Sequence, residues 1–254
     1  WYYLERMEGE PDLQQDVGNP LVRMDLRENG CFMYRVRYHG RRIAVEFFHA
    51  LTDGTGALSF LMTLAAEYLR LKKGIRIPAG GPVLDCRDNP TPEEMEDSFL
   101  RYARGAGRSR REKPAYHIAG TPERSHFLNI TTGIIPSQTV VDMAKHYGVS
   151  VTAFLTSVLI QCYQEIQLGE TNRRKATLPV KVMLPVNLRR FYGSKTLRNF
   201  ASYLNVGVMS EYGQYTFEEI LTEVKHTLGL EINEKSLNAR MSANVNAEKN
   251  PVIR

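Results

Sequence analysis

Cysteine is scarce in this sequence. The three cysteines, Cys31, Cys86 and Cys162, lie far apart, and none stands at a Cys-x-x-Cys or Cys/His zinc spacing. The pattern therefore favours neither a disulfide framework nor a structural zinc site. Because unpaired cysteines are typical of reducing compartments, the simplest expectation is a cytoplasmic protein.

Long apolar runs are also missing. The best candidate, Val151 to Tyr163, is too short for a membrane helix and is interrupted by polar residues, so we predict no transmembrane segment. No charged-then-apolar signal segment follows Trp1, the first residue. The length of 254 residues, with 43% hydrophobic and 24% charged residues, predicts a folded protein of one large or two small domains.

The excess of positive charge is small. Lysine and arginine number 33 against 28 aspartates and glutamates, which gives a net charge of +5. This mild basic bias suits an anionic small molecule as well as nucleic acid. Because no aromatic residues are interleaved with the basic ones, we expect no nucleic-acid partner.

The first half of the chain mixes strands and helices. Strands are predicted over residues 22–27, 31–38 and 43–48. After a loop over residues 49–56, the apolar positions within 58–69 predict an amphipathic helix that Gly74 ends. Thr91, followed by proline and two glutamates, predicts a further helix that runs to about residue 105.

A basic, glycine-containing stretch over residues 104–114 is interpreted as a linker, and it divides a domain 1–112 from a domain 113–254. Strands are predicted in the second domain over residues 127–135, 177–184 and 200–209, and helices over 137–147, over 151–167 and from Thr216. We expect Pro185 to stop the middle strand. Together the elements predict a mixed α/β (α+β) fold with mixed sheets.

His49 differs from the other histidines, because it ends a strand that looks buried and stands four residues before Asp53-Gly54. A strand-to-helix loop can hold an imidazole ring at the mouth of a cleft. Histidine titrates near neutral pH, so its ring can accept a proton from an alcohol or amine. Asp53 can cap the following helix or pair with a cation, and Gly54 and Gly56 permit positive φ or close backbone approach.

Three other interpretations of residues 49–56 stay open at this point. His49 and Asp53 could ligate a metal from one helix face, although no third ligand is near and the glycines argue against a helix. The run from Gly54 to Ser59 approximates a dinucleotide fingerprint, although serine replaces its third glycine. The string could also be an ordinary turn whose polar side chains satisfy the backbone.

The string His-Ala-Leu-Thr-Asp-Gly over residues 49–54 matches the HxxxDG core of the HHxxxDG motif. The chain thereby resembles the chloramphenicol-acetyltransferase-like superfamily of CoA-dependent acyltransferases, which includes peptide-synthetase condensation domains and alcohol acetyltransferases. Residues 185–189, Pro-Val-Asn-Leu-Arg, resemble the P-V-x-x-R segment of condensation-type members, and residues 197–205 resemble the strand that follows it. The overall sequence pattern most resembles that of the bacterial alcohol acetyltransferase-like branch.

The resemblance implies a two-lobed enzyme in which a CoA thioester and an acceptor meet in a tunnel between the lobes. His49 would act as general base on the hydroxyl or amine of a small-molecule acceptor, within a catalytic motif that also contains Asp53 and Gly54. Asp53 would form a structural ion pair with Arg189. Three residues are candidates to line the substrate tunnel: Asn199, Tyr203 and Asn205.

Acetyl-CoA or another acyl-CoA is the implied co-substrate, and no bound cofactor is expected. Basic side chains of the linker could meet the CoA phosphates through charge-assisted bonds: Arg104, Arg108, Arg110, Arg111 and Lys113. Two alternatives remain, a condensation-type enzyme that uses a carrier-bound thioester and a non-catalytic binding module of the same fold. The acceptor, the acyl chain length and the oligomeric state are left open.

Two features depart from the family pattern. Phe48 replaces the first histidine of the motif, but the family's catalytic histidine is the second, which is His49 here. The family's later DFGWG-type segment, near the CoA channel, is not found in this chain. Because His49 also lies close to Trp1, we expect the 254 residues to be the middle of a longer two-lobed acyltransferase.

Overall fold

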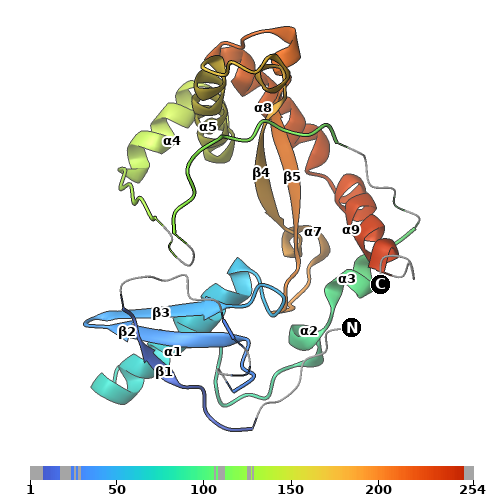
Figure 1. Ribbon diagram of the computed structural model, residues 1–254. Helices are drawn as coiled ribbons and strands as arrows, with labels where there is room; N and C mark the ends of the chain where they lie inside the picture. The colour runs from blue at the N-terminus through green and yellow to red at the C-terminus, as the bar shows by residue number, and fades with distance from the viewer. Residues whose placement is uncertain are drawn as a thin grey trace. The chain divides into compact units, whose positions relative to one another are not determined.

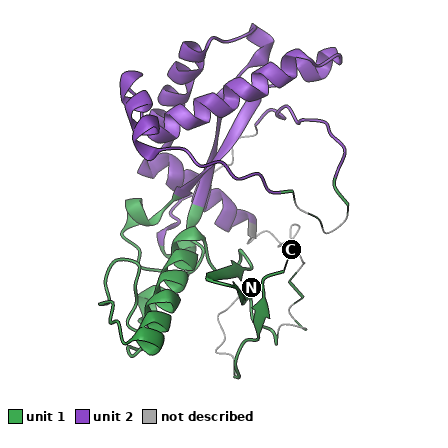
Figure 2. Cartoon of the chain, turned by 90° about the vertical axis from the view of Figure 1, so that its left-hand side faces the viewer, with its two compact units in different colours: residues 1–101, 123–129, 187–201 green, residues 102–122, 130–186, 202–254 purple. Residues whose placement is uncertain are grey.

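The computed structural model describes residues 8–17, 24–25, 27, 30–105, 107, 112–124, 127 and 129–248. The chain divides into two compact units, each discontinuous in sequence, which Figure 2 distinguishes by colour. Unit 1 comprises residues 1–101, 123–129 and 187–201, and unit 2 comprises residues 102–122, 130–186 and 202–254. The lobe boundary between residues 112 and 113 stays a prediction, and the compact units first change between residues 101 and 102.

Unit 1 contains a three-stranded sheet (Figure 1) of β1 (Leu13–Gln15), β2 (Tyr34–His39) and β3 (Arg42–Phe47). The sheet is mixed, because β1 runs parallel to β2 while β3 runs antiparallel to it with Val36 opposite Val45. Strands β2 and β3 confirm the strands predicted over residues 31–38 and 43–48. Of the strand predicted over residues 22–27, residues 24, 25 and 27 are described and none of them is in a strand, while the other three lie outside the described residues.

Helix α1 (Gly54–Lys73) packs on this sheet through aromatic side chains. The ring of Phe60 lies 5.1 Å from that of Tyr34 and 5.3 Å from that of Phe47, centroid to centroid. At its C-terminal end, Gly74 adopts a left-handed φ of 67° and donates its N–H to Arg70, as a glycine cap should. The helix predicted within residues 58–69 is thus confirmed and is longer than predicted.

The expectation that the glycines would keep residues 54–56 out of the helix is wrong. Helix α1 begins at Gly54, and the side chain of Asp53 accepts hydrogen bonds from the backbone N–H groups of Thr55 and Gly56. An aspartate at this position satisfies N–H groups that the first turn would otherwise leave without a partner. The cap therefore offsets the poor helix propensity of glycine.

The helix predicted from Thr91 to about residue 105 is two short helices, α2 (Pro92–Met95) and α3 (Ser98–Tyr102). The predicted start is confirmed, because Thr91 and Glu94 form a capping box. The helix breaks because the carbonyl groups of Glu94 and Glu96 bond to another segment of the chain. Leu197 donates its N–H to Glu94 at 2.8 Å, and the hydroxyl of Thr196 donates to Glu96 at 2.7 Å.

Unit 2 contains most of the helices and a two-stranded sheet. Its elements are α4 (Ser137–His146), α5 (Val151–Leu168), α6 (Arg173–Ala176), β4 (Val180–Asn187), β5 (Ala201–Val208), η1 (Ser210–Tyr212), α8 (Phe217–Glu231) and α9 (Glu234–Glu248); the short α7 (Arg189–Tyr192) follows β4 and belongs to unit 1. Helices α5 and α8 pack together around Ile160, Ile220 and Val224, which are fully buried. The cap residues Ser150 and Thr216 act as predicted at the starts of α5 and α8.

Two predictions about strands in the second half are wrong. The described residues between 127 and 135 form no strand, and Phe127, Ile130 and Ile134 are each more than half exposed. A segment with β propensity forms a strand only beside a partner, and none of the described strands pairs with this one. Pro185 does not stop β4, which runs on to Asn187. The β4–β5 sheet has two strands in the described chain, so each strand keeps one edge on which proline needs no N–H donor.

The prediction of a mixed α/β fold with mixed sheets is confirmed by these elements. Within the described ranges, no helix is both long and apolar enough to cross a membrane. The same ranges hold no cluster of three or more histidine, cysteine or acidic side chains that could bind a metal ion.

Candidate active site

The His49 loop lies between β3 and α1 in unit 1. Phe48 donates its backbone N–H to Met33 at 2.8 Å, and Leu51 donates to Phe48 at 2.8 Å, so the chain turns tightly after the strand. His49 sits in this turn and is exposed. The strand before it is half-buried, and a place of the imidazole ring at the mouth of a cleft stays a prediction.

Asp53 is buried at the end of this loop, with 5% of its surface exposed. One carboxylate oxygen caps α1, and the other accepts hydrogen bonds from the Arg189 guanidinium at 2.7 Å and the Phe200 N–H at 2.8 Å. Burial raises the pKa of Asp53, but the hydrogen bond and charge of Arg189 and the backbone donors outweigh it, so the pKa lies below its usual value. Asp53 therefore stays ionised and does both things predicted for it, capping the helix and pairing with a cation.

Arg189 links the Asp53 carboxylate to residues 196–200 through hydrogen bonds. Its Nε donates to the carbonyl of Thr196 at 2.8 Å, and Nη2 donates to the carbonyl of Arg198 at 2.6 Å. Because Nη1 bonds to Asp53, the planar guanidinium holds three groups in fixed positions at once. The ion pair that the motif resemblance implied for Arg189 is present in the structure.

A second contact between the same two segments lies at the start of α1. The hydroxyl of Thr52 donates to the carbonyl of Leu197 at 2.6 Å, and the backbone of Gly56 packs against both groups. A Cβ atom on Gly56 would lie 2.1 Å from the Thr52 hydroxyl and 2.3 Å from the Leu197 carbonyl oxygen. Gly56 thus has the close backbone approach that the sequence allowed. A Cβ on Gly54 would meet open space, and Gly54 has no positive φ.

Asn199 lies on the same stretch and contacts His49 directly. Its side-chain nitrogen lies 3.2 Å from the backbone oxygen of His49 and 3.4 Å from Nδ1 of the ring. The structure therefore brings together four of the predicted site residues, namely His49, Asp53, Arg189 and Asn199, although as many as 150 positions separate them in the sequence.

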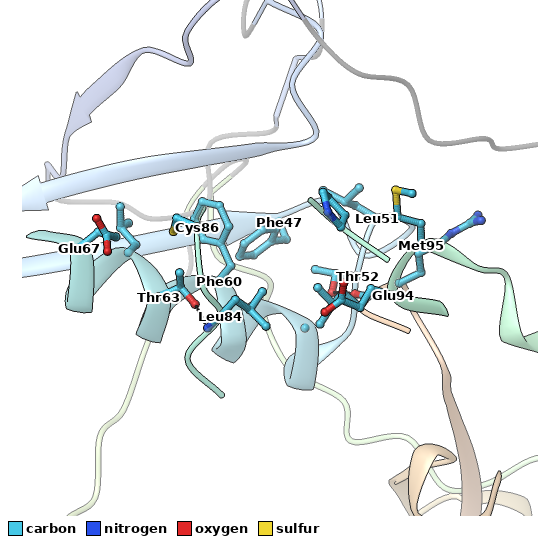
Figure 3. A pocket seen from close by; sticks show the side chains of 15 residues that line it. Phe47, Leu51, Thr52, Phe60, Thr63, Glu67, Leu84, Cys86, Glu94 and Met95 are labelled. Carbon is cyan, nitrogen blue, oxygen red and sulfur yellow. Dashed lines mark hydrogen bonds between the residues drawn. The ribbon is translucent and has the colours of Figure 1, made fainter. Parts of the chain in front are cut away.

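A largely apolar cavity of about 480 Å³ adjoins these segments in unit 1 (Figure 3). Leu51 and Thr52 line it from the His49 loop, and Phe60 lines it from α1. The opposite segments contribute Met95 and Leu197. The cavity thus shares walls with residues next to His49 and Asn199, the two residues in contact.

Tyr203 and Asn205 lie in unit 2, on one face of β5, while Leu204 and Val206 between and beyond them are buried. Both line a polar cavity of about 340 Å³, where Asn205 donates to Glu112 at 3.1 Å. Their place in a tunnel with His49 stays a prediction.

The basic linker is described only in part. Lys113 donates to Glu211 at 2.7 Å, and Arg104 is exposed with its backbone N–H bonded to Asn238. Arg108, Arg110 and Arg111 lie outside the described residues. A role of these side chains toward CoA phosphates stays a prediction.

Three contributors to the site were not predicted from the sequence. They are Thr52, Thr196 and Asn187, which donates its amide to the Thr55 hydroxyl at 3.1 Å. Thr52 and Asn187 lie inside the two motif segments at positions that the motifs leave free, and nothing in the pattern marks Thr196. Their partners lie 100 or more positions away, so no local spacing reveals the contacts.

The chain is distantly similar to several known proteins. No known protein-family profile matches the chain. The uncharacterized proteins MT2362 and Rv2305, from two strains of Mycobacterium tuberculosis, are each 26% identical to it over 175 residues. These residues make up 66% of this chain and 40% of each mycobacterial protein.

The structure is also similar to two solved structures. One is TRI101 of F. sporotrichioides in complex with coenzyme A and T-2, at a TM-score of 0.48 and 12% identity over 87% of this chain and 49% of that chain. The other is the first condensation domain of the CDA synthetase, at a TM-score of 0.45 and 16% identity over 80% of this chain and 45% of that one. The chain thus spans about half the length of each solved protein and 40% of each mycobacterial relative.

Proposed function

We propose that this chain forms part of an acyltransferase, in which His49 acts as general base while an acyl group moves from a CoA thioester to an alcohol or amine. The observation that carries the proposal is the buried pair of Asp53 and Arg189 beside an exposed His49. The resemblance of the HxxxDG and P-V-x-x-R segments to the family pattern implies this pair. Its presence supports the reading of both segments as parts of one site.

The proposed reaction needs no acyl-enzyme. His49 removes the proton from the acceptor O–H or N–H as the freed oxygen or nitrogen attacks the thioester carbonyl. The C–S bond then breaks, the acyl group stays on the acceptor, and the departing CoA thiolate takes the proton back from His49. A well-placed base contributes a factor of about 10²–10⁴ to such a rate, and binding both substrates together contributes more by removing a bimolecular encounter.

Asp53 has no part in proton transfer in this proposal. In the described part of the chain the Asp53 carboxylate accepts four hydrogen bonds, three from backbone N–H groups and one from Arg189, and none comes from His49. Its role is to fix the loop that carries His49. The same saturation leaves no free carboxylate oxygen for a metal ion shared with His49.

The test is acyl transfer by the protein expressed from its full reading frame. Acetyl-CoA is offered with a panel of alcohols and amines, and free CoA thiol is measured over time. A pantetheinyl carrier thioester is offered in parallel, because a condensation-type enzyme would use that donor in preference to CoA. Transfer from acetyl-CoA supports the proposal. Transfer from the carrier alone, or from neither donor, overturns it in favour of the condensation reaction or of a binding role.

A further inference from the structure

The segment 198–200 is held on both sides of Asn199. The carbonyl of Arg198 accepts a 2.6 Å hydrogen bond from Arg189, and the N–H of Phe200 donates a 2.8 Å hydrogen bond to Asp53. Phe200 is also fully buried and packs edge-on against Phe99 at 5.2 Å. The buried ion pair therefore fixes the backbone from which the side chain of Asn199 reaches His49.

The amide of Asn199 has one orientation that its neighbours favour. The backbone oxygen of His49 can only accept a hydrogen bond, so the amide atom 3.2 Å from it is the nitrogen. The same NH₂ group faces Nδ1 of the ring at 3.4 Å. Facing a donor, Nδ1 is the accepting nitrogen, and the neutral ring carries its proton on Nε2.

The amide oxygen of Asn199 takes no part in these two contacts with His49. It is buried and has no hydrogen-bond partner in the described part of the chain. A buried acceptor without a partner is costly. If the amide turned over, this oxygen would face Nδ1 and accept a hydrogen bond from an Nδ1–H group, which would leave the lone pair of Nε2 free.

We propose that Asn199 is the positioning residue for His49, and that the side of its amide turned toward Nδ1 decides which ring nitrogen carries the proton. The catalytic consequence rests on the proposed function, whereas the assignment of the ring proton does not. With the NH₂ group at Nδ1 the ring rests with its proton on Nε2. With the oxygen at Nδ1, the ring presents the lone pair of Nε2 as the base. The amide oxygen then accepts a hydrogen bond from the imidazolium that forms.

The ring proton can be located by ¹⁵N NMR of His49 in the full-length protein, at a pH where the ring is neutral. Wild type should show Nδ1 as the accepting nitrogen. Asn199→Asp, whose carboxylate only accepts, should move the proton to Nδ1. Asn172→Asp is the matched control, because Asn172 caps α6 in unit 2, where aspartate serves equally well. Identical ring signals in wild type and Asn199→Asp would overturn the proposal.

Activity gives a second readout. Asn199→Leu should lower kcat about tenfold or more, a fraction of the whole effect of a general base, with KM little changed. Asn199→Asp should move the acidic limb of the pH–rate profile to higher pH. If Asn199→Asp fails to fold, Asn199→Leu takes its place in the NMR test and should move the Nδ1 signal toward that of free imidazole. Wild-type protein without acyl transfer but with the expected ring signals would contradict the proposed function alone.

Discussion

Arg189 and Asp53 stand 136 positions apart and form an ion pair in which Nη1 lies 2.7 Å from Oδ2. Both side chains are nearly buried, with 11% and 5% of their surface exposed. The pair joins the loop after β3 to the segment that follows β4. The position proposed for His49 depends on this junction, which we define as the Asp53–Arg189 pair and the two segments that it joins.

Breaking the pair should destabilise unit 1. Removing one partner of a buried pair leaves the other charge uncompensated, so Asp53→Asn or Arg189→Gln should each lower the free energy of unfolding by about 3–5 kcal/mol. The double variant should lose less than the sum of the two, because the uncompensated charge is gone. Urea unfolding measures all three. Arg240→Gln, which breaks a half-exposed pair with Glu231, is the control and should cost about 1 kcal/mol or less.

Gly54 and Gly56 should respond oppositely to substitution by alanine. Gly56→Ala places a Cβ 2.3 Å from the Leu197 carbonyl oxygen, and such overpacking costs about 1–3 kcal/mol. Gly54→Ala meets open space in the first turn of α1, so it should be neutral or stabilise by about 0.4–1 kcal/mol. Thermal or urea unfolding of the two variants compares them directly. Equal effects of the two substitutions would contradict the close approach at Gly56.

Acid should weaken the junction. The pKa of Asp53 is lowered in the folded protein from its usual value of 3.8, so the unfolded chain takes up the proton first as pH falls. The stabilisation is therefore fully present above about pH 4 and is lost as pH falls through the folded pKa. The difference in unfolding free energy between wild type and Asp53→Asn should shrink over that range. The exposed Asp142→Asn variant serves as the control, and an unchanged difference at low pH for Asp53→Asn would contradict the account.

The hydroxyl of Thr52 should contribute more to the stability of the protein than the shape of the side chain. Thr52→Val keeps the volume but leaves the Leu197 carbonyl without its 2.6 Å donor, which should cost about 1–3 kcal/mol. Thr52→Ser keeps the hydroxyl and should lose less. If valine is tolerated as well as serine, the hydrogen bond does not hold the two segments together.

The parts of the fold and of the site that depend on local chemistry could be predicted from the sequence. An aspartate before a helix caps it by its own geometry, and Gly74 and Thr216 end and begin helices for equally local reasons. The ion pair of Asp53 was predicted because two motif segments were recognised together. No spacing in the chain indicates that Thr52 bonds to a carbonyl 145 positions away.

The wrong predictions for residues 127–135 and for the helix from Thr91 both concern long-range contacts that the sequence does not show. Residues 127–135 have the composition of a strand, but a strand also needs a neighbour, which the sequence does not show. The helix from Thr91 breaks because Thr196 and Leu197 take the carbonyl groups that would have continued it. A long-range partner is missing in the first place and overrides local propensity in the second.

We propose that His49 is the general base of an acyl transfer. The most direct test compares kcat for acetyl-CoA-dependent transfer in wild type, His49→Ala and His226→Ala, where His226 is an exposed histidine of α8. His49→Ala should lower kcat by a factor of about 10²–10⁴ while CD and unfolding stay as in wild type, and His226→Ala should change nothing. Transfer by His49→Ala at the wild-type rate would contradict the account.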